Sequence, residues 1–213
     1  MGSAFRLPRV YPITDTRISG LSHAEQVARF ADGGATVVQL RDKHASPSQF
    51  YEQAKAALEV ANQGGMQLII NDRVDIALAI GAPGVHLGQD DLPPEAARRL
   101  LGDAAVIGYS THSLSQLLAA TELPVDYLAI GPIFPTATKE NPDPVVGWAG
   151  LRGCREAIGD RLLVAVGGIS ATNAFEVIAA GADSVALISG LLADPQRISE
   201  NFRSLLASLP TPD

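Results

Sequence analysis

The feature that most constrains the fold of this chain is a regular alternation of two kinds of segment. Short aliphatic runs are separated by amphipathic or alanine-rich stretches from one end to the other. The runs cover residues 10–13, 36–40, 67–70, 84–87, 105–108, 126–130, 162–166 and 184–188. Most are rich in Val, Ile or Leu and are bounded by Gly, Asp, Asn or Pro, which is typical of buried parallel strands.

Helical patterns occupy the intervals between these runs. We expect helices over residues 23–31, 46–61, 93–101, 114–120, 171–180 and 197–206. The first follows Ser22, with Glu25 at the spacing of a capping box, and the fifth follows Ser170 and stops at Gly181. About eight β-then-α units in one chain predict an α/β fold, a single-domain (β/α)₈ TIM barrel over residues 1–213. An open doubly wound sheet is the alternative, and it would have fewer strands.

Composition narrows the class of protein further. Hydrophobic residues make up 46% and charged residues 18% of the 213 residues, as expected of a packed globular domain. The net charge of −7 argues against nucleic acid as a partner, because phosphates require a basic surface. The single cysteine, the absence of a signal-like N-terminus and the lack of a bilayer-spanning stretch predict a cytoplasmic protein. The sequence leaves a homo-oligomer open.

Unusual polar residues cluster at the ends of the expected strands or directly after them. They include Gln39, Arg41, Asp42, Lys43, Asn71, Asp72, Asp91, Ser110, Thr136, Thr138, Lys139 and Ser189, and Gly168 lies at an equivalent position after the seventh run. In a closed barrel all of these positions lie on one face, where barrel enzymes form their active sites. In an open sheet they could not all meet. The pattern therefore favours one pocket built from distant parts of the chain.

Two carboxylates and several cations indicate the chemistry of this pocket. Asp72 and Asp91 follow consecutive strands, and a carboxylate pair completed by substrate phosphate oxygens is a usual Mg²⁺ site. Each aspartate could instead cap the helix that follows it. Arg41, Lys43 and Lys139 are suited to phosphoryl oxygens, although loop cations are more often simply exposed.

Glycines and uncharged polar residues complete the candidate site. Gly167-Gly168 and Ile188-Ser189 follow the last two strands, where barrels often bind phosphate through backbone N–H groups, although ordinary turns also contain glycine. Gln39 and Ser110 could orient a heteroaromatic ring. The proline-containing loop from Thr136 onward could cover a site. His112 could act as an acid or base but is more often structural, and we interpret His23, His44, His86, Trp148 and Cys154 as structural or surface residues.

Five motifs in register carry a family resemblance. They are Gln39-Leu40-Arg41-Asp42-Lys43, Ile70-Asn71-Asp72-Arg73, Gly84-Val85-His86-Leu87-Gly88-Gln89-Asp90-Asp91, Gly131-Pro132-Ile133-Phe134-Pro135-Thr136-Ala137-Thr138-Lys139 and Val166-Gly167-Gly168-Ile169. Together they strongly resemble the thiamine phosphate synthase family over nearly the whole chain, from about Tyr11 to Ser189.

The resemblance implies a Mg²⁺-dependent transferase. Such an enzyme joins 4-amino-2-methyl-5-hydroxymethylpyrimidine diphosphate to a thiazole phosphate, plain or carboxylated, and releases pyrophosphate, with CO₂ also released in the carboxylated case. It implies that the pyrimidine diphosphate is held by Gln39, Leu40, Arg41, Asp42, Lys43, Asn71, Ser110 and Lys139, with Arg41, Lys43 and Lys139 acting in catalysis. It also implies Asp72 and Asp91 as Mg²⁺ ligands. The thiazole phosphate would be held by Thr136, Ala137, Thr138, Gly168, Ile188 and Ser189.

Some positions depart from the family pattern. Asp42 stands where the family frequently has Glu, and Gly190 where many members have Ala. Ser110-Thr111-His112-Ser113 is similar to the related thiazole tautomerases, in which a histidine transfers protons, but those relatives generally lack the two carboxylates. A thiazole tautomerase and a non-catalytic sensor of a phosphorylated ligand are the alternatives to the synthase.

Overall fold

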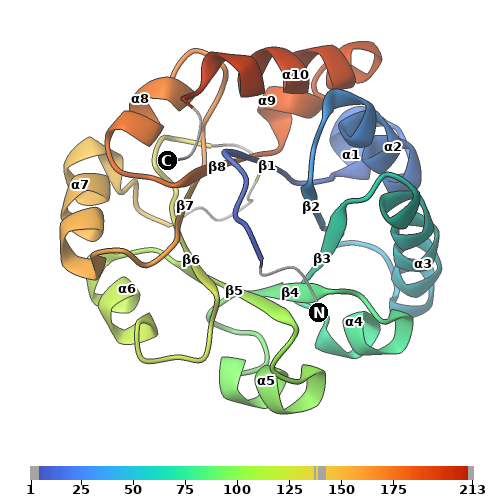
Figure 1. The fold of residues 1–213 in the computed structure, drawn as a ribbon, viewed down its shortest axis with the longest axis horizontal. Helices are drawn as coiled ribbons and strands as arrows, with labels where there is room; N and C mark the ends of the chain where they lie inside the picture. Colours follow the sequence, from blue (N-terminus) through green and yellow to red (C-terminus); the bar gives the residue numbers. More distant parts are fainter. Residues whose placement is uncertain (1–4, 137, 139–142, 211–213) are drawn as a thin grey trace.

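Eight parallel strands form one sheet in the computed structural model, which describes residues 5–136, 138 and 143–210. The order along the sheet is β1-β8-β7-β6-β5-β4-β3-β2. The strands are β1 (Val10–Pro12), β2 (Val37–Leu40), β3 (Gln67–Asn71), β4 (Gly84–Leu87), β5 (Val106–Thr111), β6 (Tyr127–Ile130), β7 (Leu163–Val166) and β8 (Ser184–Leu187). A parallel bridge between Ile13 and Gln39 brings β1 beside β2 and closes the barrel seen in Figure 1.

Helices surround this barrel on the outside (Figure 1). They are α1 (Thr16–Ser19), α2 (His23–Gly33), α3 (Pro47–Gln63), α4 (Val74–Ile80), α5 (Pro94–Leu101), α6 (Leu114–Ala120), α7 (Gly147–Ile158), α8 (Ala174–Ala179), α9 (Ser189–Leu192), the 3₁₀ turn η1 (Pro195–Arg197) and α10 (Ile198–Ser208). No helix in the described part of the chain is long and apolar enough to cross a membrane.

The core has two parts, one on each side of the sheet. The larger lies between the strands and the helices and includes Val38, Leu68, Val85 and Leu128. The smaller fills the inside of the barrel with the alternate residues of the strands, namely Tyr11, Ile13, Val37, Ile69, Val106, Tyr127, Ala129, Val164 and Ala186. The inward and outward alternation of a strand therefore decides which residues can reach a site inside the barrel.

One repeated arrangement joins neighbouring units at the N-terminal end of the strands. Asp126, just before β6, accepts from the backbone N–H of Ile107 at 2.7 Å and from Arg98 of α5 at 2.8 Å. Asp183, just before β8, accepts from the N–H of Leu163 at 2.8 Å and from Arg155 of α7 at 2.7 Å. These ion pairs therefore stabilise the N-terminal end of the barrel, which lies opposite the loops that follow the strands.

The expected (β/α)₈ barrel is confirmed, and all eight strands occur within a few residues of their expected positions. The expected strand over 105–108 was too short: β5 continues to Thr111, so Ser110 and Thr111 lie on the strand and not after it. Four α-helices in the described part of the chain, α1, α4, α7 and α9, were not predicted from the sequence. In α7, glycines at positions 147, 150 and 153 weaken the helical signal, and α4 is a short apolar segment without a side-chain cap.

Candidate active site

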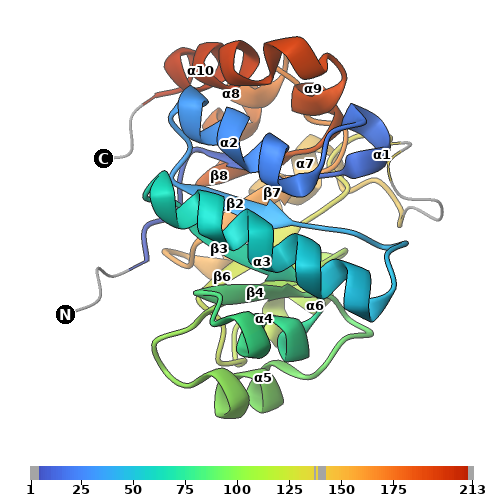
Figure 2. The ribbon, with the colours of Figure 1, turned by 90° about the vertical axis from the view of Figure 1, so that its right-hand side faces the viewer.

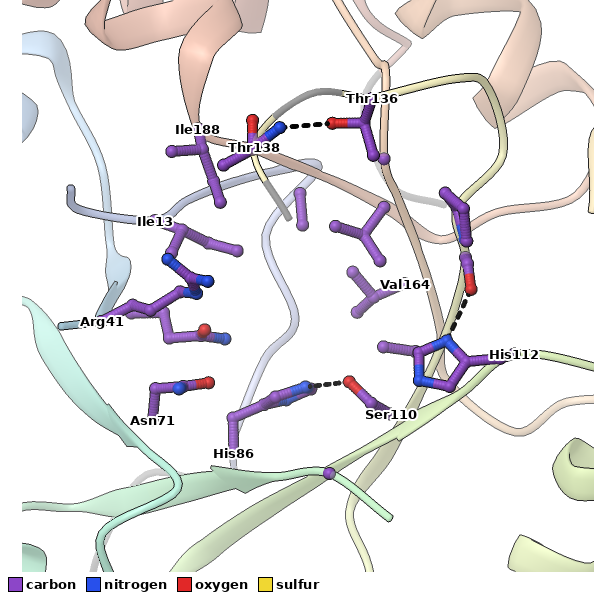
Figure 3. A pocket seen from close by; sticks show the side chains of 18 of the residues that line it. Ile13, Arg41, Asn71, His86, Ser110, His112, Thr136, Thr138, Val164 and Ile188 are labelled. Atoms are coloured by element: carbon purple, nitrogen blue, oxygen red, sulfur yellow. Dashed lines mark hydrogen bonds between the residues drawn. The ribbon is translucent and has the colours of Figure 1, made fainter. Parts of the chain in front are cut away.

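A cavity of about 490 Å³ lies at the C-terminal end of the barrel. Every strand contributes at least one lining residue, for example Tyr11, Gln39, Asn71, His86, Ser110, Ala129, Val164 and Ala186. Figure 2 shows the loops that follow the strands gathered at one end of the molecule. Figure 3 shows Arg41 and Asn71 on one side of the cavity and Ser110 and His112 on the other. The predicted convergence of distant polar residues on one pocket is therefore present.

Asp72 and Asp91 meet in this cavity, where their side chains are within hydrogen-bonding contact. Asp72 has a φ of +63° and is the one non-glycine residue with positive φ among those the structure describes. Its N–H donates to the carbonyl of His86 at 2.8 Å, which fixes this unusual backbone beside β4. Aspartate tolerates this conformation better than most residues, and strained backbone of this kind is concentrated at functional sites.

The helix-capping alternative for these two carboxylates is wrong. The helix after Asp72 has Arg73 as its N-cap and the helix after Asp91 has Pro93, and neither start is capped by a side chain. Asp91 instead accepts from the N–H of Gly88 at 2.7 Å, within its own loop. Neither carboxylate therefore caps a helix, and helix capping does not explain why these two aspartates are present.

Electrostatics around the pair favour a bound cation. Burial, and then the adjacent carboxylate of Asp72, raise the pKa of Asp91, while the N–H of Gly88 opposes this shift. Lys43, on the neighbouring loop after β2, forms an ion pair with Asp72. Among the described residues no group of three or more His, Cys, Asp or Glu side chains could hold a metal without other ligands. Two carboxylates plus oxygens from a phosphorylated ligand fit the donor set that Mg²⁺ prefers.

The two cations expected on the loop after β2, Arg41 and Lys43, both line the cavity but have different ion-pair partners. Arg41 lines the cavity, and its guanidinium lies 3.4 Å from the carboxylate of Asp15. Lys43 also lines the cavity, and 47% of its side chain is exposed, so an incoming ligand can reach it. Lys139 and Ala137 lie outside the described residues, so their expected roles stay predictions from the sequence.

Two residues expected to hold the pyrimidine diphosphate point away from the cavity. Leu40 is fully buried in the core between the sheet and the helices, because it alternates with the inward-facing Gln39. The carboxylate of Asp42 accepts from the N–H groups of His44 and Ala45 at 2.8 and 2.9 Å and lies 3.5 Å from His23. Leu40 therefore packs in the core and Asp42 shapes the loop that carries Lys43, and their expected contacts with the pyrimidine diphosphate stay predictions from the sequence.

The glycine pair after β7 forms the wall next to the loop that follows β6. Gly168 has a φ of +64°, and a Cβ there would lie 2.6 Å from the carbonyl oxygen of Pro135. The backbone therefore needs glycine at this position for both reasons. Gly168, Ile188, Ser189, Thr136 and Thr138 all line the cavity, and the N–H of Thr138 donates to the hydroxyl of Thr136 at 3.3 Å.

Two histidines of the described residues, His86 and His112, line the cavity. His86, interpreted above as structural or surface, is buried inside the barrel, and its Nε2 lies 2.8 Å from the hydroxyl of Ser110 (Figure 3). Period-2 alternation along β4 would have placed it inward, since Val85 and Leu87 face the helices. The Nδ1 of His112 lies 2.7 Å from the carbonyl of Gly131, so Nδ1 carries the proton of this hydrogen bond.

The remaining structural interpretations are confirmed. His23 is buried and bonds to the hydroxyl of Thr14 at 2.7 Å. His44 is exposed beside Arg17, and Cys154 is fully buried. Trp148 lies on the outside of the barrel and packs edge-on against Phe134.

A closed barrel whose strand ends surround one cavity with paired carboxylates, cations and a glycine-lined backbone is an enzyme for phosphorylated small molecules. Comparison with known proteins identifies the family. A family profile described as "Thiamine monophosphate synthase" matches residues 10–191. Thiamine-phosphate synthase of Chloroflexus aurantiacus is 44% identical over 202 residues, which are 93% of this chain and 93% of that protein. The chain belongs to the thiamine monophosphate synthase family.

Further relatives agree with this assignment. Thiamine-phosphate synthase of Koribacter versatilis is 44% identical over 215 residues, covering 98% of this chain and all of that protein. A solved structure described as thiamine phosphate pyrophosphorylase from Pyrococcus furiosus superimposes with a TM-score of 0.82 at 35% identity, covering 93% of this chain and 95% of that one. The resemblance inferred from the five sequence motifs is thereby confirmed.

Proposed function

We propose that this chain is a Mg²⁺-dependent thiamine-phosphate synthase. It joins 4-amino-2-methyl-5-hydroxymethylpyrimidine diphosphate to a thiazole phosphate, plain or carboxylated, to give thiamine phosphate and pyrophosphate, and CO₂ is also released when the thiazole is carboxylated. The observation that carries the proposal is the meeting of Asp72, Asp91 and Lys43 at one side of the cavity. The names of the relatives point to the same reaction.

The diphosphate would lie at the mouth of the cavity, where the charged residues are. Asp72 and Asp91 would hold the Mg²⁺ there. Arg41 and Lys43 would contact the remaining oxygens, with Lys139 joining them from the loop after β6. The ion pair between Lys43 and Asp72 supports this placement of the diphosphate. A diphosphate bound there would contact the ammonium group of Lys43 close to the carboxylates of Asp72 and Asp91.

The chemistry is a dissociative substitution. As the C–O bond to the diphosphate breaks, positive charge develops on the pyrimidine methylene and negative charge on the leaving group. Asp72 and Asp91 would contribute through the Mg²⁺ they hold, whose positive charge would stabilise the departing pyrophosphate. Arg41 and Lys43 stabilise the same charge through preorganised contacts. The electron-rich aminopyrimidine delocalises the cation, so the reaction needs no covalent bond to the protein.

The thiazole phosphate would bind on the other side of the cavity, against the backbone of Gly168, Ile188 and Ser189 and the hydroxyls of Thr136 and Thr138. Backbone N–H groups at such a wall suit a phosphate. Fixing the phosphate would hold the thiazole nitrogen close to the pyrimidine methylene. Orientation alone can contribute a large part of the rate enhancement in such a step.

The test is an assay with both substrates, with Mg²⁺ or with excess chelator, in which thiamine phosphate is detected by fluorescence after oxidation. We expect product only with Mg²⁺. Asp91→Asn should lower kcat/KM by about a hundredfold or more, as loss of a metal ligand at a reacting charge does. Asp103→Asn, an exposed carboxylate in the loop before β5, is the matched control and should retain full activity. Full activity of Asp91→Asn would contradict the proposal.

The same assay separates the alternatives. A thiazole tautomerase would isomerise the thiazole phosphate without metal or pyrimidine, and His112→Ala would abolish that activity. A sensor would be stabilised by ligands without turnover.

Finer properties of the protein follow from the same proposal. We infer that the enzyme acts in the cytoplasm, since Cys154 is a buried free thiol. Its partners would be small phosphorylated substrates and not nucleic acid. A homo-oligomer stays open.

A further inference from the structure

The loops that follow β1 and β2 leave the barrel side by side. Ile13 bridges Gln39 in parallel register, and the N–H of Thr14 donates to the carbonyl of Gln39 at 2.9 Å. Two residues beyond the bridged pair lie Asp15 on one loop and Arg41 on the other. A side chain on the loop after β1 can therefore reach the arginine that we expect to contact the diphosphate.

Arg41 is held at both ends by the loop after β1. Its backbone N–H donates to the hydroxyl of Thr14 at 3.2 Å, and this hydroxyl lies 2.7 Å from Nδ1 of the buried His23. Its guanidinium donates through Nη1 to Oδ2 of Asp15 at 3.4 Å. Both side chains of this ion pair are mostly buried, with 18% of Arg41 and 14% of Asp15 exposed. A guanidinium with so little access to water needs a carboxylate partner.

The carboxylate of Asp15 uses its two oxygens for two different contacts. Oδ1 accepts from the N–H groups of Arg17 and Ile18 at 3.0 and 3.3 Å and so caps the start of α1. Oδ2 is the oxygen that accepts from Arg41. The N–H of Asp15 donates to the side chain of Gln26 in α2 at 3.0 Å. The position of Oδ2 is therefore set by α1 and α2, outside the cavity.

Of this ion pair, only Arg41 lines the cavity (Figure 3). A guanidinium has five N–H donors in a planar fork, so a contact at Nη1 leaves donors for a ligand. An arginine side chain loses much rotamer freedom when it is fixed in one orientation. Because Asp15 fixes Arg41 before a ligand arrives, this loss does not weaken the binding of the ligand.

We propose that Asp15 is a positioning residue that holds the guanidinium of Arg41 in the orientation in which its remaining N–H groups meet the diphosphate. This rests on the proposed function, in which Arg41 contacts the diphosphate. Repulsion between the carboxylate and the anion acts in the opposite direction. Under the proposal, removal of the carboxylate weakens diphosphate binding, whereas repulsion alone would make the same removal strengthen it. The sign of the change therefore decides between the two effects.

The test uses Asp15→Asn and Asp15→Ser, which both keep the cap of α1. Asn and Ser cap helices about as well as Asp, but neither has a second oxygen for Arg41 once the cap has formed. Calorimetric titration measures the binding of inorganic pyrophosphate with Mg²⁺ and, separately, of thiazole phosphate. We expect pyrophosphate binding to weaken about tenfold, the size of one hydrogen bond to a charged group, and thiazole phosphate binding to stay within about twofold.

The steady-state assay gives a second readout. For both variants, kcat/KM for pyrimidine diphosphate should fall about tenfold, because Arg41 would stabilise the charge of the leaving group. The KM for thiazole phosphate should not change, since this substrate would bind on the other side of the cavity. A general disturbance of the fold would affect both substrates.

A double substitution shows whether Asp15 acts through Arg41. Arg41→Met removes the guanidinium and keeps a long unbranched side chain. In that background Asp15→Asn should have little further effect on pyrophosphate binding, because the group that Asp15 positions is gone. Asp194→Asn is the matched control: Asp194 is exposed and caps η1 by accepting from the N–H of Gln196 at 3.1 Å. It should leave every measured value unchanged.

Three results would overturn the inference. They are unchanged or tighter pyrophosphate binding by a folded Asp15 variant, an equal loss for pyrophosphate and thiazole phosphate, and an undiminished effect of Asp15→Asn in the Arg41→Met background. If one Asp15 variant does not fold, the other still tests the inference, since Asn and Ser differ in size and chemistry.

The same measurements separate this inference from the proposed function, because pyrophosphate binding requires no turnover. A wild-type chain that makes thiamine phosphate, with Asp15 variants that bind pyrophosphate normally, refutes the positioning role alone. A wild-type chain that binds pyrophosphate with Mg²⁺ but never makes thiamine phosphate refutes the synthase alone. Failure of the wild-type chain to bind either pyrophosphate or pyrimidine diphosphate refutes both.

Discussion

Gly108→Ala should be among the most damaging methyl additions in this protein. The added Cβ would lie 2.0 Å from the Cζ atom of Tyr127 and 2.3 Å from its hydroxyl. Ordinary carbon contacts are about 3.5 Å or longer, so the ring would have to move by roughly 1.5 Å. It cannot move freely, because its hydroxyl bonds to Tyr11 and His86.

The expected cost combines two effects. Overpacking of a filled core costs about 1–3 kcal/mol, and displacement of the Tyr127 hydroxyl leaves buried polar partners unpaired at about 1 kcal/mol or more each. We expect Gly108→Ala to lower the free energy of unfolding by about 3–5 kcal/mol. Urea denaturation followed by circular dichroism measures this directly.

Two further variants make the reasoning refutable. Gly153→Ala is the matched control: it lies within α7, no atom would contact its new Cβ, and the substitution should stabilise the protein by about 0.5–1 kcal/mol. Tyr127→Leu removes the clashing atoms, so its combination with Gly108→Ala should cost clearly less than the two single changes added together. A loss below about 1 kcal/mol for Gly108→Ala, or strict additivity of the pair, would refute the steric account.

Two other predictions concern stability away from the cavity. Burial lowers the pKa of His23, so below about pH 6.5 the unfolded chain binds a proton that the folded chain does not. The free energy of unfolding should therefore fall as the pH drops through this value. In urea denaturation curves measured at several pH values, His23→Gln should make this dependence on pH weaker. Asp126→Ala and Asp183→Ala should each cost about 1–3 kcal/mol, because the N–H groups of Ile107 and Leu163 lose their carboxylate partners, yet kcat/KM should not change. A loss of activity without a loss of stability would contradict that separation.

The barrel could be predicted from the sequence because each strand is a short aliphatic run bounded by turn residues, and eight of them leave few alternative folds. The helix α7 could not be predicted, since glycines at every third position from 147 to 153 suppress the local signal. Its stability comes from packing, with Leu151, Cys154 and Ile158 buried against the sheet. Tertiary burial overrides a weak propensity in such a segment.

The charged part of the site could be predicted because it follows strands directly. Asp72 and Asp91 were recognisable from position alone, and they do meet. The hydrogen bonds that join Tyr11, Tyr127 and His86 inside the barrel could not be predicted, because these three residues look like ordinary core residues of β-strands. Only the register of β4, β5 and β6, which pairs His86 with Gly108 and Gly108 with Tyr127, brings these side chains into one chain of bonds.

Neutral and charged side chains of the site lie at different depths along the axis of the barrel. Groups that stay neutral through burial, such as His86 and Tyr127, lie inside on the strands, where desolvation makes any charge costly. Charged groups, such as Lys43 and Asp72, lie on the loops, where water and ligand oxygens can solvate them. A substrate with a neutral ring at one end and a diphosphate at the other matches this gradient in one orientation only. The barrel interior would then select the ring and the loops would stabilise the leaving group, so substitutions in the two regions should affect different ligands.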